Sequence, residues 1–166
     1  MEKHQIIQQF FEEPILESPT SFGSGHINDT YKFSIEQAGK EEHFILQRIN
    51  HKVFKEPQKV MENIQLIADY LTCSNQIGGN FKLPPIYTKK VLSPIFTLDK
   101  DLIYRDTSQN YWRIFPFFKN TYSIDKVDNE EQAFEAASAF GEYLNALKDL
   151  NTETLHVTIP NFHNGV

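Results

Sequence analysis

The chain has 166 residues, of which 40% are hydrophobic and 23% charged, as is typical of one soluble globular domain. Its net charge of −6 argues against a broad nucleic-acid surface, and no apolar run approaches the roughly 18 residues of a membrane helix. Cys73 is the only cysteine, which excludes an internal disulfide and suits a reducing compartment, so we expect a cytoplasmic protein.

The first third of the chain predicts a short helix followed by two strands. Residues 3–12 place apolar side chains on one side, and Pro14 ends that pattern. Residues 27–35 alternate between apolar and polar side chains, as a strand with one buried face does. A polar turn at 36–42 separates them from a second predicted strand at 43–49.

The remaining elements complete an α+β order. We expect a helix at 57–73, a hairpin at 93–106 that turns at 99–101, a strand at 110–118 and a helix at about 128–150. The apolar stripes that mark the packing faces of the two helices are Val60, Ile64, Ile67 and Leu71 in the first and Ala133, Ala137, Phe140, Leu144 and Leu147 in the second. This order predicts a twisted antiparallel sheet of about five strands with flanking helices.

The segment FGSGHINDTYKF, residues 22–33, contains two closely spaced glycines. A dinucleotide-binding loop needs a third glycine where Asn28 stands and a helix after it, whereas here a strand follows. A P-loop needs Gly-Lys-Ser/Thr, which is absent from the chain. Two interpretations remain: an ordinary turn, or the kind of glycine hairpin that covers nucleotide phosphates in kinases.

The predicted strand at 43–49 carries a cation two residues after an aliphatic side chain. Leu46 and Arg48 therefore share one face of the strand. The third strand of a kinase presents an aliphatic residue to the adenine and a cation to the phosphates in this arrangement. The alternative is that Arg48 is an ordinary solvent-facing strand residue.

The blocks GSGHINDTY, FILQRIN, VF followed by MENI, YWRIFPFF and IPNFHN occur in this order over nearly the whole chain. Together they resemble the aminoglycoside phosphotransferase superfamily, and more narrowly the sugar kinases similar to N-acetylhexosamine 1-kinase. The resemblance implies a protein-kinase-like N-terminal lobe at 1–118, with a hinge at about 112–118. Residues 119–166 would then be a connecting helix and the start of a truncated C-terminal lobe.

The resemblance also implies a nucleotide site for ATP. Its expected residues are Gly23, Ser24 and Gly25 in the phosphate-covering loop, His26 and Asn28 at the loop exit, Leu46 over the adenine, Arg48 at the phosphates, Asn63 or Glu62 as the partner of Arg48, and Phe115 and Phe117 in the hinge. At 100° per residue Glu62 lies nearly opposite the apolar stripe and Asn63 at its edge, so both stay open as partners.

The family's catalytic loop, His-x-Asp-x-x-x-x-Asn, and its metal-binding Asp do not occur in this chain. The catalytic residues and the Mg²⁺ ligands are therefore expected beyond Val166, and we expect this chain alone to be inactive. The resemblance implies an ATP-dependent kinase that phosphorylates a sugar such as an N-acetylhexosamine at its anomeric hydroxyl. Kinases of the same superfamily with an aminoglycoside, choline or homoserine as acceptor are an alternative. Another alternative is a binding or regulatory module without catalysis.

The sequence also gives expectations about binding partners and metal ions. The expected partners are the nucleotide, the acceptor and the protein's own C-terminal lobe, with no nucleic acid and no membrane. A lobe without its partner should expose an apolar face and self-associate. The six histidines form no His-x-x-x-His pattern, so the sequence predicts no metal site in this chain.

Overall fold

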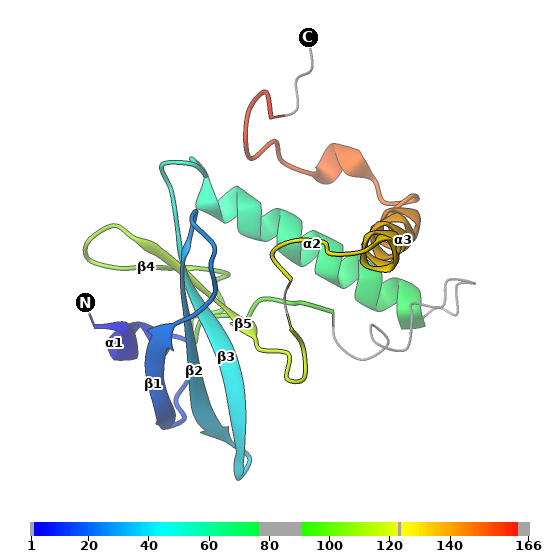
Figure 1. Cartoon of the computed structure of the whole chain (residues 1–166). Helices are drawn as coiled ribbons and strands as arrows, with labels where there is room; N and C mark the ends of the chain where they lie inside the picture. Colours follow the sequence, from blue (N-terminus) through cyan, green and yellow to red (C-terminus); the bar gives the residue numbers. More distant parts are fainter. Residues whose placement is uncertain (1, 77–90, 123, 163–166) are drawn as a thin grey trace.

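The computed structural model describes residues 2–76, 91–122 and 124–162 (Figure 1). Its elements are α1 (Lys3–Ile7), β1 (Ile15–Ser21), β2 (Asp29–Gln37), β3 (Lys40–Ile49), α2 (Pro57–Gln76), β4 (Tyr104–Arg105), β5 (Tyr111–Pro116), α3 (Glu130–Ala146) and the 3₁₀ turn η1 (Thr152–Thr154). The strands form one sheet in the order β1-β2-β3-β5-β4, and every neighbouring pair is antiparallel. The predicted α+β class and five-stranded antiparallel sheet are confirmed.

One face of the sheet packs on α1 and the turn that follows it. Ile6, Ile7, Phe10 and Phe11 contact inward-facing residues of the strands, which are Phe33, Ile35, Phe44, Leu46, Trp112 and Ile114. The α-helix ends at Ile7, earlier than predicted, but the apolar residues after it still enter this core. We call this side of the sheet the α1 face.

The opposite face packs on α2 and is called the α2 face (Figure 1). The fully buried Met61 of α2 contacts a small cluster with Ile49 and Phe115. The expected stripe is wrong in its centre, because the buried positions in the described side chains of α2 are Pro57, Met61 and Ala68. The stripe residues themselves, Val60, Ile64, Ile67 and Leu71, are half-buried.

The region expected to form a hairpin is less regular than predicted. Tight hydrogen bonds close the turn, with the amide of Thr97 donating to Asp101 and the amide of Lys100 donating to Thr97. Ile95, however, makes only an isolated bridge to Ile114, and β4 pairs with β5 over two residues. β5 is therefore paired along its length with β3 but only in part on its other edge.

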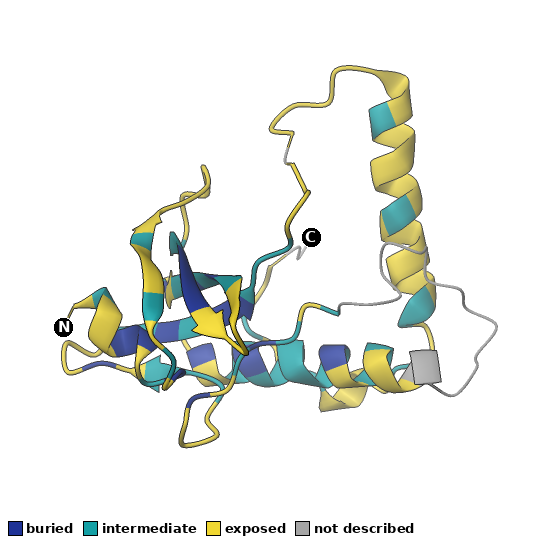
Figure 2. Cartoon of the chain, turned by 90° about the horizontal axis from the view of Figure 1, so that it is seen from below, coloured by how far each residue is buried: buried dark blue, intermediate teal, exposed yellow. Residues whose placement is uncertain are grey.

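The helix α3 lies apart from the sheet, beside α2 (Figures 1 and 2). Asn129 caps its first turn by accepting a hydrogen bond from the amide of Gln132 over 2.9 Å. None of its residues is buried, and the predicted stripe residues Phe140 and Leu144 are exposed. No helix in the described ranges is both long and apolar enough to cross a membrane.

Candidate functional site

Three polar side chains cross the α2 face from the second strand to the fifth. Gln47 of β3 lies directly opposite Thr30 of β2 on one side and Arg113 of β5 on the other. Arg113 Nε donates to Gln47 Oε1 over 3.0 Å, and Gln47 Nε2 donates to Thr30 Oγ1 over 3.1 Å. We call Thr30, Gln47 and Arg113 the polar row. Arg113 donates to Gln47 and Gln47 donates to Thr30, so the Thr30 oxygen is an acceptor in this row. Its own hydroxyl hydrogen therefore remains able to donate to a ligand.

Arg113 is the charged member of the polar row and is held in apolar surroundings. Its Nη1 donates to Met61 Sδ over 3.5 Å, and its guanidinium carbon lies 5.1 Å from the centre of the Phe115 ring. Within the described ranges no carboxylate pairs with it. Burial lowers the pKa of Arg113 to about 10, so it stays protonated at neutral pH. Arg113 is half-buried, and a partly desolvated cation without an acidic partner favours an anionic ligand.

The glycine loop joins β1 to β2 beside the Thr30 end of the polar row. The amide of Phe22 donates to the carbonyl of Thr30 over 2.9 Å, which anchors the start of the loop there. Gly23 has a φ of +82°, a conformation that a side chain would strain. A Cβ atom at Gly23 or Gly25 would meet nothing within 4 Å, so the space around the loop is open to a ligand.

The expected position of Arg48 is wrong. Its side chain shares a face with Leu46, as predicted, but this is the α1 face. Arg48 Nε donates to Asp29 Oδ2 over 2.6 Å, and its Nη2 pairs with the same atom. Leu46 is fully buried in the core beneath α1, so it is not placed to contact an adenine on the α2 face. The alternation of β3 is as predicted, but Arg48 lies on the face opposite α2, where it lines a separate cleft with Tyr31 and Trp112.

The two rival partners of Arg48 instead contact the segment after α3. The Asn63 side chain donates to the backbone carbonyl of His156 over 2.9 Å and accepts from its amide over 2.8 Å. Glu62 Oε2 lies 2.9 Å from His156 Nε2. Neither residue reaches Arg48, because the two helix residues and the arginine belong to opposite sides of the sheet. Asn63 and Glu62 thus tie α2 to the 155–157 segment.

The remaining expected loop residues divide into structural and exposed positions. Asn28 Oδ1 accepts a hydrogen bond from the amide of Asn50 over 2.9 Å, which joins the loop exit to the end of β3. Ser24 is exposed and its hydroxyl lies 3.4 Å from Asp125 Oδ1. His26 is also exposed. These three residues frame the loop, and the geometry gives only Asn28 a fixed partner within the sheet.

The predicted hinge forms the end of β5, but its free backbone groups differ from those expected. The amide of Phe117 donates to the carbonyl of His43 over 2.9 Å, so it faces β3 and is occupied. By strand alternation the amide of Phe115 also faces β3. The carbonyl of Ile114 faces the other edge, where Ile95 donates to it over 2.9 Å. By the same alternation the carbonyl of Pro116 lies on that edge too, and Phe118 comes two residues after it, beyond the end of β5.

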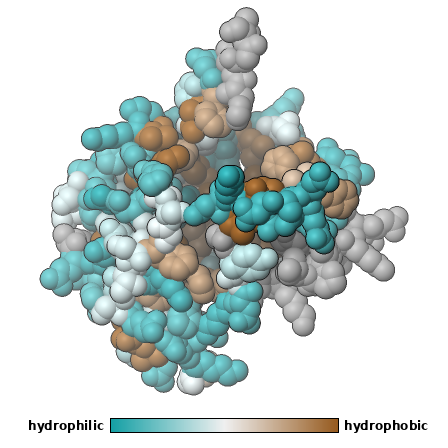
Figure 3. All heavy atoms as spheres, viewed as in Figure 1, coloured by the Kyte–Doolittle hydropathy of each residue, from teal (hydrophilic) through white to brown (hydrophobic). Residues whose placement is uncertain are grey.

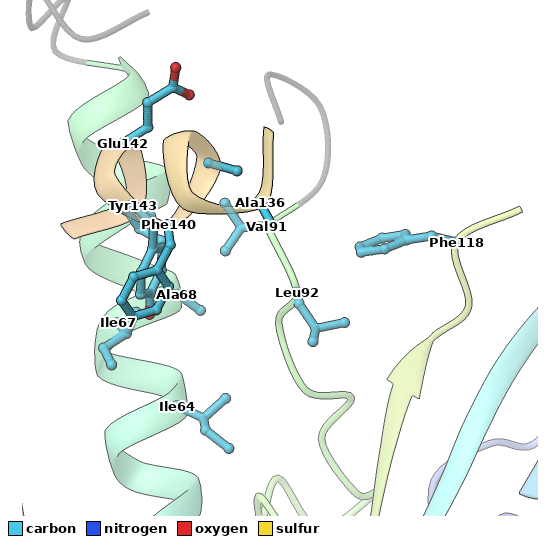
Figure 4. A pocket seen from close by; sticks show the side chains of 12 residues that line it. Ile64, Ile67, Ala68, Val91, Leu92, Phe118, Ala136, Phe140, Glu142 and Tyr143 are labelled. Atoms are coloured by element: carbon cyan, nitrogen blue, oxygen red, sulfur yellow. The ribbon is translucent and has the colours of Figure 1, made fainter. Parts of the chain in front are cut away.

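An apolar cleft of about 590 Å³ lies between α2, residues 91–92, Phe118 and α3 (Figure 4). Ile64 and Ile67 line it from α2, and Phe140 and Tyr143 line it from α3. Figure 4 shows Leu92 and Phe118 on the side toward the sheet. The cleft is separate from the polar row, since none of the three polar-row residues lines it. Its lining offers no array of charged groups that could orient a phosphate.

No family model matches the chain. Among solved structures it is similar to a spectinomycin phosphotransferase, APH(9)-Ia, determined in complex with ADP and spectinomycin. The identity is 13% and the TM-score 0.45, and the match covers 84% of this chain. The chain spans only 36% of the length of that structure. A likeness of this size adds nothing on the ligand or the activity, which therefore depend on the geometry described above.

Sequence reasoning missed Arg113 and preferred Arg48 to its neighbour Gln47 as the site residue of the third strand. Both lie in segments that it selected, FILQRIN and YWRIFPFF, but the alternation of each strand does not reveal which face a helix will cover. One signal was present in YWRIFPFF, where Arg113 is the single charge in a run of aromatic and aliphatic residues. A charge in such a strand has to be paired, exposed or functional.

Proposed function

We propose that this chain is the nucleotide-binding lobe of an ATP-dependent small-molecule kinase. The observation that carries the proposal is the polar row, which runs from beneath the glycine loop to the partly desolvated Arg113. Phosphoryl transfer depends mainly on positioning and on stabilising negative charge, so a kinase lobe needs a fixed cation and free donors at the phosphates. The proposed contacts are the Arg113 guanidinium, the Thr30 hydroxyl and the loop amides of Gly23 to Gly25.

The proposed adenine contacts are backbone groups at the end of β5. The carbonyl of Pro116 lies on the edge that faces away from β3, and the proposal turns the amide of Phe118, two residues later, toward the same edge. An acceptor and a donor at this spacing complement the amino group and the adjacent ring nitrogen of adenine. Phe22 and Phe117, whose ring centres are 5.5 Å apart, bring the glycine loop and this strand end together on one side of the sheet.

Mg²⁺ is the metal that such a reaction uses, and it would neutralise charge on the phosphates. No carboxylate in the described ranges contacts Thr30, Gln47 or Arg113, so the polar row does not offer the oxygen ligands that Mg²⁺ prefers. We propose that the metal ligands and the catalytic base belong to a C-terminal lobe, which would also cover the exposed apolar side of α3. The acceptor that we propose is a sugar such as an N-acetylhexosamine, as the sequence resemblance implies.

A second candidate function is a nucleotide-responsive binding module without catalysis. It is favoured by the neutral Gln47, which occupies the α2 face of the third strand where an active kinase carries lysine. The two candidates share the nucleotide site and differ in phosphoryl transfer. They are separated by assaying a longer protein that contains this chain with ATP, Mg²⁺ and a panel of sugars, aminoglycosides, choline and homoserine.

The nucleotide site is tested by titrating the ¹⁵N-labelled chain with ADP and following amide chemical shifts, a method that also detects weak binding. We expect the shifts to gather at Gly23–Gly25, Thr30, Gln47, Arg113 and Phe118. Arg113→Met should raise the Kd for ADP at least about tenfold, roughly 1.4 kcal/mol. The matched control is Arg48→Met, which removes a cation from the opposite face and should leave the Kd unchanged. Shifts confined to the α1 face, or none at millimolar ADP, would contradict the proposal.

A further inference from the structure

A second group of chemically active side chains lies on the α2 face, at the end of the sheet near the β2–β3 turn. Glu17 comes from β1, and Glu41 and His43 come from β3. One ligand atom of each residue lies within 4.8 Å of the other two. The three side chains are brought together over Ser34 of β2, which is fully buried. Carboxylate oxygen and imidazole nitrogen are both ligands of Zn²⁺ and related divalent metals.

The imidazole of His43 is not satisfied by its neighbours. Nδ1 lies 3.7 Å from Glu17 Oε2 and Nε2 lies 3.9 Å from Glu41 Oε1, distances too long for hydrogen bonds. Nδ1 is buried and has no hydrogen-bonding partner among the described residues. Neither glutamate pairs with a lysine or arginine in the described ranges. Lys119 Nζ donates to the backbone carbonyl of Glu41 over 3.2 Å but does not pair with its carboxylate. The group therefore combines two carboxylates that form no ion pair with a lysine or arginine and a ring nitrogen that lacks a partner.

Other contacts hold these side chains in place. The Ser34 hydroxyl donates to Glu41 Oε1 over 2.7 Å and accepts from the amide of Glu17 over 3.2 Å. The register of β1 against β2 shifts on both sides of Glu17, which adjusts the direction of this residue. The His43 ring lies edge-on to Phe117, with 6.3 Å between ring centres. Partners of this kind fix the orientation of metal ligands and raise the affinity of a site.

We propose that Glu17, Glu41 and His43 bind a divalent metal of the Zn²⁺ class. The metal would take one oxygen from each glutamate and one nitrogen from the histidine, with water completing the tetrahedral set that Zn²⁺ prefers. The two negative charges balance the ion, and a modest movement of the exposed glutamates closes the ligands around it. The site shares no residue with the polar row, and the proposal does not rest on the proposed nucleotide function. Because the carbonyl of His43 accepts the Phe117 amide, metal binding would stiffen the end of β5.

The test is a calorimetric titration of the metal-free chain with Zn²⁺ at pH 7.5, followed by Co²⁺, whose visible absorption reports coordination. We expect one Zn²⁺ per chain, bound at micromolar Kd, together with a rise in the unfolding temperature. Glu17→Gln, Glu41→Gln and His43→Asn should each raise the Kd at least about tenfold. Circular dichroism of each variant checks that it is folded, and the two glutamate variants, on exposed side chains, keep the test decisive should His43→Asn unfold.

The matched controls are Glu62→Gln and His156→Asn, which disrupt the other glutamate–histidine contact in the described ranges. Both variants should bind Zn²⁺ as the unaltered chain does. The proposal is overturned by the absence of one-to-one binding at about 100 µM Zn²⁺, far above the affinity of a structural zinc site. It is equally overturned if Zn²⁺ binding survives both Glu17→Gln and Glu41→Gln, or if it is lost in His156→Asn.

Discussion

The two faces of the sheet differ although they are built from the same strands. The α1 face is apolar and closed over its centre, with Leu46, Phe33 and Ile114 fully buried beneath α1 and the turn that follows it. Only at its edge, where Arg48 lies, does this face reach a polar cleft. The α2 face has a small apolar cluster around Met61 and carries the polar row beside it. Figure 3 shows apolar and polar side chains side by side over the visible surface. The closed face stabilises the fold, and the other face keeps polar groups available for a ligand.

The largest expected effect belongs to the closed face. Leu46→Ala should lower the free energy of unfolding by about 2–5 kcal/mol, because Leu46 is fully buried and its removal leaves a cavity. Urea denaturation measures the loss. The matched control is Ile45→Ala, at a neighbouring half-buried residue on the α2 face. This variant should lower the free energy of unfolding clearly less than Leu46→Ala does. Equal losses would mean that the two faces contribute alike to stability.

A smaller effect is expected at Asp106, which is 4% exposed beside the α1 face. It accepts hydrogen bonds from Trp112 Nε1 over 2.8 Å and from the amides of Ser108 and Asn110. Asp106→Asn puts an amide donor among these donors and should cost about 2 kcal/mol of unfolding free energy. The exposed Asp99→Asn, at the turn, serves as the control and should change little.

The same residue predicts a pH dependence. Burial alone raises the pKa of Asp106, but the hydrogen bonds from Trp112, Asn110 and Ser108 outweigh it, and the net pKa lies below its usual value. A lowered pKa stabilises the folded chain above the unfolded-state pKa of about 4, and this contribution is lost as the pH falls through the folded pKa. Denaturation of wild type and Asp106→Asn between pH 6 and 3 should show the difference between them shrinking below about pH 4.

Next comes the polar row itself. Gln47→Leu removes the acceptor of Arg113 Nε and the donor to Thr30 Oγ1, and it should lower the unfolding free energy by about 1 kcal/mol. It should also weaken ADP binding, because the guanidinium loses the contact that orients it. Thr30→Val keeps the shape of the side chain and removes only the hydroxyl. It therefore leaves the contact between Gln47 and Arg113 in place and shows how much the hydroxyl itself contributes to stability and to ADP binding. Unchanged ADP affinity in Gln47→Leu would show that the polar row is only structural.

The smallest effect is expected for the cation on the closed side. Arg48→Ala breaks an ion pair with Asp29 in which both side chains are more than 40% exposed, a type that contributes about 0–1 kcal/mol. ADP affinity should stay the same, because Arg48 is on the α1 face. A marked loss of ADP binding in this variant, measured by the same titration, would place the nucleotide on the α1 face. The α1 face would then be the ligand-binding side of the sheet.

Much of the fold follows from short-range patterns. The alternation in 27–35 and 43–49 fixes two strands, because a half-buried sheet sorts side chains with a period of two. Pro57 marks the first residue of α2, where its missing amide hydrogen costs nothing. The order of helices and strands was enough to predict an antiparallel α+β fold. The boundaries of α1 and the irregular 93–106 region depended on long-range packing and were predicted less well.

The sequence by itself determined that Leu46 and Arg48 share one face and that Gln47 belongs to the other. Only the tertiary structure decided which face α1 closes and which one carries the polar row, because a strand's alternation is the same whichever side a helix packs on. The same limit applies to Glu17, Glu41 and His43. These three side chains lie close together because of the register of β1, β2 and β3. That register is set by the whole sheet and not by the spacing of residues along the chain.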